Sequence, residues 1–166
     1  MSTNMPGNDW TSLPTSEWVL RLSVKSKDFQ VTRKASPEAF ALSTQEKQDP
    51  HPRLSVWAQT LTTPVQAWEI MGSKPAYELV LSLEVETIRS IQPNPKQPVF
   101  PQMDVVWHTL YVLQGGCQVL DSRPGSKGHA GITGLEETPS LKMQRKSLRS
   151  QLADKSIVSE LNLELG

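Results

Sequence analysis

Short runs of strand-forming residues, each bounded by prolines, glycines or charged residues, recur through the centre of this chain of 166 residues. The clearest of them are WVLRLSV (18–24), LSVWA (54–58), YELVLSL (77–83) and VVWHTLYVL (105–113). Runs this rich in branched and aromatic side chains favour β-strands. The last run is interpreted as one buried strand, straight or bulged, that ends at two glycines. Shorter strands are predicted at 117–120 and 130–132, on either side of the turn DSRPGSKG.

Capping residues predict where the helices lie. Thr63, Pro64 and Gly72 follow the order of an N-cap, a first helical residue and a C-terminal glycine. Between them, apolar side chains recur every three residues, which favours packing in a core over binding a cofactor. Residues 84–91 change from strand spacing to helical spacing, with Ser82 as the predicted N-cap.

Shifts in composition suggest how the chain is organised. Residues 1–17 are polar and broken by prolines, which predicts a flexible leader unless Trp10 or Leu13 packs on the body. Residues 18–136 are expected to form a single domain. Residues 137–166 begin basic and helix-prone and end acidic, which predicts a helical C-terminal extension. The expected fold is α+β, with a mixed or mostly antiparallel sheet of about five strands and two or three short helices.

Charge and cysteine content narrow the classes of function. Lys plus Arg and Asp plus Glu both number 17, so the formal net charge is zero. The chain therefore lacks the long-range field that attracts proteins to nucleic acid or anionic lipid. A single cysteine, Cys117, excludes an internal disulfide and a zinc site built from several cysteines. With no apolar leader, we expect a soluble, cytoplasmic protein without membrane contact, metal or cofactor.

Several short motifs, taken in order, resemble a family of small bacterial proteins that have no assigned reaction. These motifs are WVLRLSV, SPEAFAL, LSVW followed by TTPVQAW, LSLEVETIRSI, QVLDSRP and GHAGITGL. The resemblance covers residues 18–135, and the proline-rich stretch and the basic tail depart from it. It implies an intracellular bacterial protein encoded near defence or toxin–antitoxin genes. It also draws attention to His129, Asp121 and the strand at 54–56.

The leading hypothesis is a non-catalytic accessory or adaptor module that binds another protein. Trp10 is predicted to be exposed. The connector 92–102 contains four prolines together with Phe100 and is a candidate docking strip. An apolar stripe in the tail packs either on the body or on another chain, and its candidate contact residues are Leu141, Leu148 and Leu152.

The second hypothesis is a small enzyme that acts on a nucleotide or nucleic acid. In a hydrolase, His129 would be the general base, Asp121 would orient it, and Ser122 would complete the set. A pocket that gathers Arg21, His129 and Asp121 would favour this hypothesis. Dispersed polar groups beside an exposed apolar patch would favour the adaptor.

An ADP-ribosyltransferase-like sheet is the other form that the enzyme hypothesis takes. In that form Arg21 and Ser55, on the first two strands, would line a cleft together with a carboxylate such as Glu78. The residues themselves do not decide between this arrangement and a hydrolase.

A third hypothesis is association with nucleic acid through the tail. Four basic residues lie close together there: Lys142, Arg145, Lys146 and Arg149. No aromatic residue interleaves with them for base stacking, so a solvated helix face is the competing interpretation. Binding through this cluster would depend strongly on salt concentration.

Overall fold

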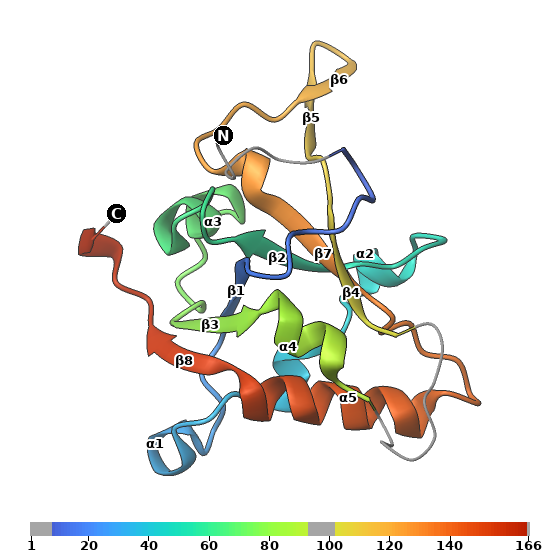
Figure 1. Cartoon of the computed structure of the whole chain (residues 1–166). Helices are drawn as coiled ribbons and strands as arrows, with labels where there is room; N and C mark the ends of the chain where they lie inside the picture. Colours follow the sequence, from blue (N-terminus) through green and yellow to red (C-terminus); the bar gives the residue numbers. More distant parts are fainter. Residues whose placement is uncertain (1–7, 93–101, 166) are drawn as a thin grey trace.

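A six-stranded sheet forms the centre of the computed structural model, which describes residues 8–92 and 102–165. Its strand order is β4-β7-β2-β1-β3-β8, and each neighbouring pair is antiparallel (Figure 1). The bounds are β1 Trp18–Ser23, β2 Leu54–Ala58, β3 Leu79–Glu84, β4 Asp104–Trp107, β7 His129–Thr133 and β8 Ile157–Glu160. The expected α+β fold with a mostly antiparallel sheet is confirmed, but the structure has more strands than the predicted five and more short helices than the predicted two or three.

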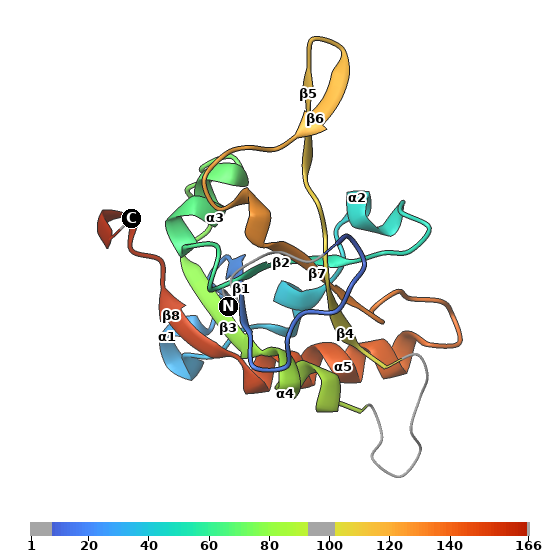
Figure 2. The same cartoon turned by 45° about the horizontal axis from the view of Figure 1, so that its top comes forward.

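A separate hairpin pairs β5 (Tyr111–Gln114) with β6 (Cys117–Leu120). It projects away from the main sheet (Figure 2). The sequence predicted a single buried strand over 105–113, and this prediction was wrong. The run leaves the main sheet after Trp107, whose partner is Ala130 in β7, and Tyr111 then pairs with Leu120.

Short helical segments surround the sheet. Their bounds are α1 Phe29–Thr32, η1 Pro37–Phe40, α2 Thr44–Lys47, α3 Pro64–Ile70, α4 Val85–Ser90, η2 Ser126–Gly128, α5 Lys142–Lys155 and η3 Leu163–Leu165. The predicted cap of α3 is confirmed, because the Thr63 hydroxyl accepts from the Gln66 N–H and the Gln66 side chain accepts from the Thr63 N–H. The predicted Ser82 cap of α4 was wrong, because β3 continues to Glu84, which occupies the N-cap position.

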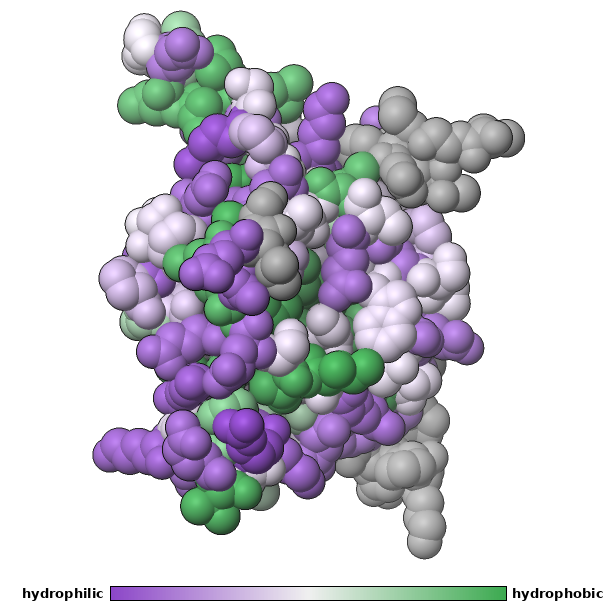
Figure 3. Space-filling view, turned by 90° about the vertical axis from the view of Figure 1, so that its left-hand side faces the viewer, coloured by the Kyte–Doolittle hydropathy of each residue, from purple (hydrophilic) through white to green (hydrophobic). Residues whose placement is uncertain are grey.

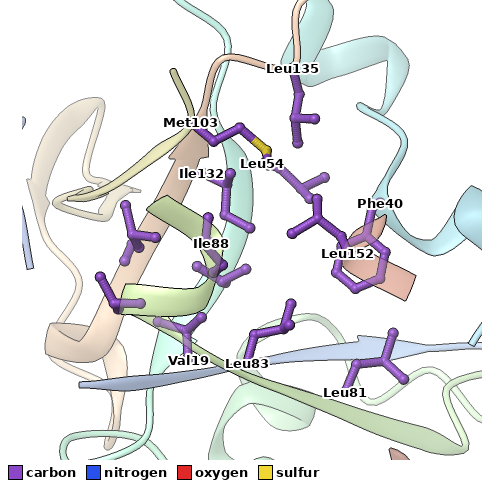
Figure 4. Packing of buried hydrophobic residues seen from close by; sticks show 14 of the residues in the cluster. Val19, Phe40, Leu54, Leu81, Leu83, Ile88, Met103, Ile132, Leu135 and Leu152 are labelled. Atoms are coloured by element: carbon purple, nitrogen blue, oxygen red, sulfur yellow. The ribbon is translucent and has the colours of Figure 1, made fainter. Parts of the chain in front are cut away.

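The main core lies between one face of the sheet and the helices α4, α5 and η1. Leu152 of α5 packs there near Phe40 of η1 (Figure 4). Both side chains are fully buried, and removing such a leucine from water contributes roughly 2 kcal/mol. None of the helices in the described ranges has both the length and the apolar character needed to cross a membrane.

The opposite face of the sheet is covered over only part of its width. Leu20, Trp57 and Val80 on this face form a second cluster with Ala67 of α3. Helix α3 lies away from edge strand β4 in both ribbon views (Figures 1 and 2). The part of this face that belongs to β2, β7 and β4 is therefore the part on which a cleft can form.

The two ends of the described chain join the sheet. Leu13 is buried, its N–H donates to the Val105 carbonyl, and Ser12 forms a bridge with Val106. Residues 8–17 therefore pack on the body, whereas 1–7 lie outside the described residues. Beyond α5 the predicted helical extension contains a strand, because β8 pairs with β3 and becomes the second edge of the sheet.

Candidate functional site

A cleft of about 750 Å³ opens over the incompletely covered face of the sheet. Side chains from most of the chain meet there. Its lining is Arg21, Ser43, Gln45, Glu46, Asp49, Arg53, Ser55, Trp57, Ile70, Met71, Lys74, Tyr77, His108, Leu110, Tyr111, Asp121, Arg123 and His129. The volume lies within the range of small-molecule sites.

The strand register explains why the floor of the cleft is polar. Ser55 faces Gly131 and Trp57 faces His129 across β2 and β7. Since side chains alternate along a strand, Arg53 lies on the same face as Ser55 and Trp57. A Cβ on Gly131 would lie 2.5 Å from the Arg53 Cβ. The Arg53 side chain therefore passes over β7 at Gly131, where there is no side chain to obstruct it.

Two histidines stack in the wall of the cleft. The ring centroids of His108 and His129 are 4.6 Å apart, and Trp57 lies 4.7 Å from His129 on the same measure. The Nδ1 atom of His129 is 3.0 Å from the His108 carbonyl oxygen. Because a carbonyl can only accept, Nδ1 carries the proton, and the neutral ring keeps a lone pair on Nε2.

Both histidines are neutral near pH 7. Burial lowers the pKa of His129 to about 3, with a further contribution from neighbouring His108. Burial also lowers the pKa of His108, and the positive charge of Arg53 adds to the effect. In this state the rings act as hydrogen-bond partners, and their protonation requires a lower pH than that of a solvent-exposed histidine.

Arg53 is a buried cation beside these rings, with 7% of its surface exposed. Its Nη1 donates to Asp9 Oδ1 at 2.8 Å and to the Trp107 carbonyl at 3.3 Å. Its guanidinium lies 3.6 Å from the centroid of the Trp10 ring. Neither Arg53 Nε nor His108 Nδ1, although buried, has a hydrogen-bond partner in the described part of the chain.

Asp121 lines the cleft, but Arg123 engages its carboxylate. The Arg123 Nη2 donates to Asp121 Oδ2 at 2.6 Å, and this contact lowers the pKa of Asp121. Among the described residues no hydrogen bond joins Asp121 to His129. Ser122 is exposed and does not line the cleft. The set of Ser122, His129 and Asp121 is therefore not assembled as a hydrogen-bonded triad.

Arg21 reaches the cleft through a gap between two strands. Strands β1 and β2 pair at Val19 with Ala58 and at Leu20 with Trp57. Beyond that point the Arg21 Nη1 donates to the Ser55 carbonyl at 2.7 Å.

Glu46 occupies the same gap and accepts from the Ser55 N–H at 2.9 Å. Although burial opposes it, the N–H groups of Ser43 and Ser55 lower the pKa of Glu46. Arg21 and Glu46 thus replace the missing ladder hydrogen bonds, which is a structural role. Glu78 lies outside the cleft and forms an ion pair with Lys25.

The residues predicted to bind a partner differ in their exposure to solvent. Trp10 is exposed as expected, and Phe100 lies outside the described residues. Leu141 is half-buried. Leu148 and Leu152 need correction, because both are buried in the core of this chain and cannot contact a partner.

The predicted basic cluster is not a surface cluster of four cations. Arg145 is 1% exposed, and its Nε donates to the Glu136 carbonyl at 2.9 Å. Arg149 forms an ion pair with Glu137. Lys142 and Lys146 remain exposed. Arg145 is therefore buried in the protein and Arg149 is paired with a carboxylate. Two of the four residues proposed to contact nucleic acid are not available as exposed, unpaired cations.

Sequence reasoning identified Arg21, His129 and Asp121 but gave no site role to Arg53 and His108. The signal for Arg53 was its position two residues before Ser55, which places both on one face of β2. Within residues 8–92 and 102–165, no three His, Cys, Asp or Glu side chains form a group that could hold a metal ion. Comparisons with protein-family models, curated proteins and solved structures found no match to this chain.

Proposed function

We propose that this protein is a small enzyme that acts on a nucleotide-class ligand in the cleft. The observation that carries the proposal is the convergence of His108, His129 and the buried cation Arg53, far apart in sequence, on one cleft. A cleft that combines titratable groups of shifted pKa with a buried cation is a typical functional-site arrangement. A bacterial cytoplasmic setting, near defence genes, is part of the same proposal.

The ligand class is inferred from the chemistry of the lining. Tyr111 and Tyr77 offer aromatic surface on which a base can stack. Lys74 and the buried Arg53 line the same cleft and provide positive charge for a phosphate. A ligand that combines a planar ring with an anionic group matches both features, and a nucleotide is such a ligand.

The chemistry we propose is general acid–base catalysis by His108. Its ring is only partly buried and starts neutral, so it can accept a proton. In a hydrolysis, His108 that has taken up a proton would give it to the leaving oxygen, while the attacking water releases its own proton to solvent. His129 would position His108, since its Nδ1–H holds the His108 carbonyl.

The test is a binding and turnover screen with the purified full chain. Nucleoside mono-, di- and triphosphates are titrated by calorimetry, with the parent nucleosides as controls that lack the anion. We expect binding of at least one nucleotide, weakened more than tenfold by Tyr111→Ala and unchanged by Val31→Ala on α1. Product formation should be lost in His108→Ala. If wild-type protein binds none of the nucleotides, the proposal is wrong.

A second candidate function, the protein-binding adaptor, is favoured by the projecting hairpin. Leu113 and Leu120 are 75% and 64% exposed, and with Tyr111 they lie on one face of the hairpin. Hydrophobic side chains gather at this end of the molecule (Figure 3). Residues 111–120 contain no charge and no proline, the usual protection of a strand edge. An extended segment of another protein that adds a strand here is the partner we propose.

The adaptor candidate is tested with a matched pair of variants. Leu113→Lys places a charge on the hairpin, and Val31→Lys places the same charge on an exposed apolar position of α1. A partner captured by the wild-type protein should be lost with Leu113→Lys and retained with Val31→Lys. Equal retention by both variants would rule out the hairpin as the contact surface.

A further inference from the structure

Two of the residues that line the cleft each have an unpaired polar atom. Arg53 Nε and His108 Nδ1 are buried, and neither has a hydrogen-bond partner among the described residues. Arg53 also donates to the carbonyl of Trp107, the residue directly before His108. Buried polar groups are nearly always paired, so unpaired nitrogens on two residues that line the same cleft indicate that a ligand group pairs with them.

The charged groups around His108 come from several elements. Arg53 precedes β2, Asp9 belongs to the N-terminal segment, and Glu46 and Asp49 come from α2 and the turn after it. His129 stacks on the ring from β7.

The carboxylates near His108 already have donors of their own. Asp9 accepts from Arg53, Glu46 accepts from the N–H groups of Ser43 and Ser55, and Asp49 accepts from the His51 N–H. Arg53 is the cation that acts on the His108 ring, and its Nε has no hydrogen-bond partner among the described residues. The missing partner is therefore an acceptor, and an anion fits best beside a guanidinium.

We propose that Arg53 and His108 form a subsite for one oxyanion group of the ligand, and that His108 takes up a proton from solvent when this anion binds. The inference rests on the proposed function and names the part of the cleft that holds the phosphate. The ring of His108 is partly exposed, so a rotation about its Cβ–Cγ bond brings Nδ1 toward the cleft. No covalent bond changes in this step.

Burial and the positive charge of Arg53 keep the His108 ring neutral, and a bound anion counteracts both effects. The proton therefore goes to His108. A negative charge within hydrogen-bond distance favours the imidazolium form, and the anion also offsets the repulsion from Arg53. His129 is less suited, since it is more deeply buried and its Nδ1–H is already used. The subsite therefore couples binding of the anion to the uptake of one proton.

Sulfate is the probe for the test, because its charge stays constant between pH 5 and 8, unlike that of phosphate. The histidine ring signals of the full chain are followed by NMR through a pH titration, with and without sulfate. We expect sulfate to raise the apparent pKa of His108 by about one unit or more. Sulfate affinity should increase as the pH falls, by up to tenfold for each pH unit, which is the limit for one linked proton.

Two variants separate the subsite from other sources of anion affinity. His108→Gln should remove the pH dependence while leaving weaker sulfate binding, and Arg53→Gln should weaken sulfate binding at every pH. His51→Gln, at an exposed position outside the cleft, should match the wild type. Because the NMR titration uses the unmodified protein, the inference stays testable if a variant does not fold.

The outcomes distinguish this inference from the proposed function. An unchanged His108 titration in saturating sulfate, or affinity that does not depend on pH, would overturn the coupled subsite even if nucleotides bind. Conversely, coupled sulfate binding without binding of any nucleotide would support the subsite and reject nucleotides as its ligands.

Discussion

The rings of His108 and His129 stack with their planes 38° apart, and the ring of one residue donates a hydrogen bond to the backbone carbonyl of the other. This contact joins the end of β4 to the start of β7. Two imidazoles can pack this closely because both are neutral, and protonation of both would place like charges against each other. The contact therefore makes the stability of the protein depend on pH.

The first prediction is that stability decreases as the pH falls below the usual pKa of histidine. Burial lowers the pKa of His129 from 6.5 to about 3 in the folded protein. Between these values the unfolded chain binds the proton and the folded chain does not, so stability rises with pH through this window. The slope from this residue is about 1.4 kcal/mol per pH unit. Urea unfolding at pH 7, 6 and 5 measures it.

His129→Gln provides the comparison for this prediction. Whatever its free energy of unfolding at pH 7, this variant should lose less stability than the wild type between pH 7 and pH 5. His51→Gln should keep the wild-type slope, since it leaves the buried pair intact. Equal slopes in wild type and His129→Gln would show that the buried ring does not control the acid sensitivity.

A second prediction concerns the close passage of Arg53 over Gly131. Gly131→Ala would place a methyl group 2.5 Å from the Arg53 Cβ, well inside contact distance. We expect a destabilisation of about 1 to 3 kcal/mol and displacement of the arginine. Chemical denaturation measures the first effect, and sulfate affinity measures the second.

Gly115→Ala in the turn of the hairpin is the control for this overlap. An added Cβ meets nothing within 4 Å there, and the residue carries only the strain of its φ of +58°. Its sulfate affinity should equal that of the wild type. If Gly131→Ala also binds sulfate normally, the position of Arg53 does not depend on the glycine.

A third prediction separates the basic residues of α5 by burial. Arg145→Ala removes a buried stem and a hydrogen bond to the Glu136 carbonyl, and should destabilise the fold by about 2 to 3 kcal/mol. Lys146→Ala, at an exposed position of the same helix, should change stability by less than about 0.5 kcal/mol. Thermal unfolding of the two variants is the measurement. Similar losses in both would contradict the buried placement of Arg145.

A fourth prediction tests whether the N-terminal segment belongs to the fold. Leu13 is 2% exposed and lies in the main core. Leu13→Ala should cost about 2 to 4 kcal/mol, as expected for a leucine truncated in a core. Val24→Ala, at an exposed position, is the control and should be nearly neutral. A neutral Leu13→Ala would mean that the segment contributes little to folding.

The parts of the fold that the sequence predicted well are those determined by neighbouring residues. Thr63 and Gly72 bound α3 through local capping, and β6 spans the predicted residues 117–120. The division of 105–113 at His108 was not predicted, because it depends on pairing with β7. Strand β8 was missed for the same reason. Apolar and polar residues do not alternate clearly along it, and its partner β3 is distant in sequence.

The candidate site was predicted only in part for a related reason. His129 and Asp121 drew attention because polar residues flank a glycine-rich turn, which is a local signal. Arg53 and His108 join them through the register of β2, β7 and β4, which pairs Ser55 with Gly131 and Val106 with the same glycine. Such a register depends on packing of the whole sheet and has no local sequence signature.

The place of β7 between β2 and β4 has a consequence for synthesis on the ribosome. A nascent chain that ends before residue 129 contains β4 and β2 but lacks the strand that joins them. Until β7 emerges, the apolar residues of β4 lack their neighbour, and chaperones can recognise such an unpaired edge. The cleft is therefore completed only after β7 has been synthesised.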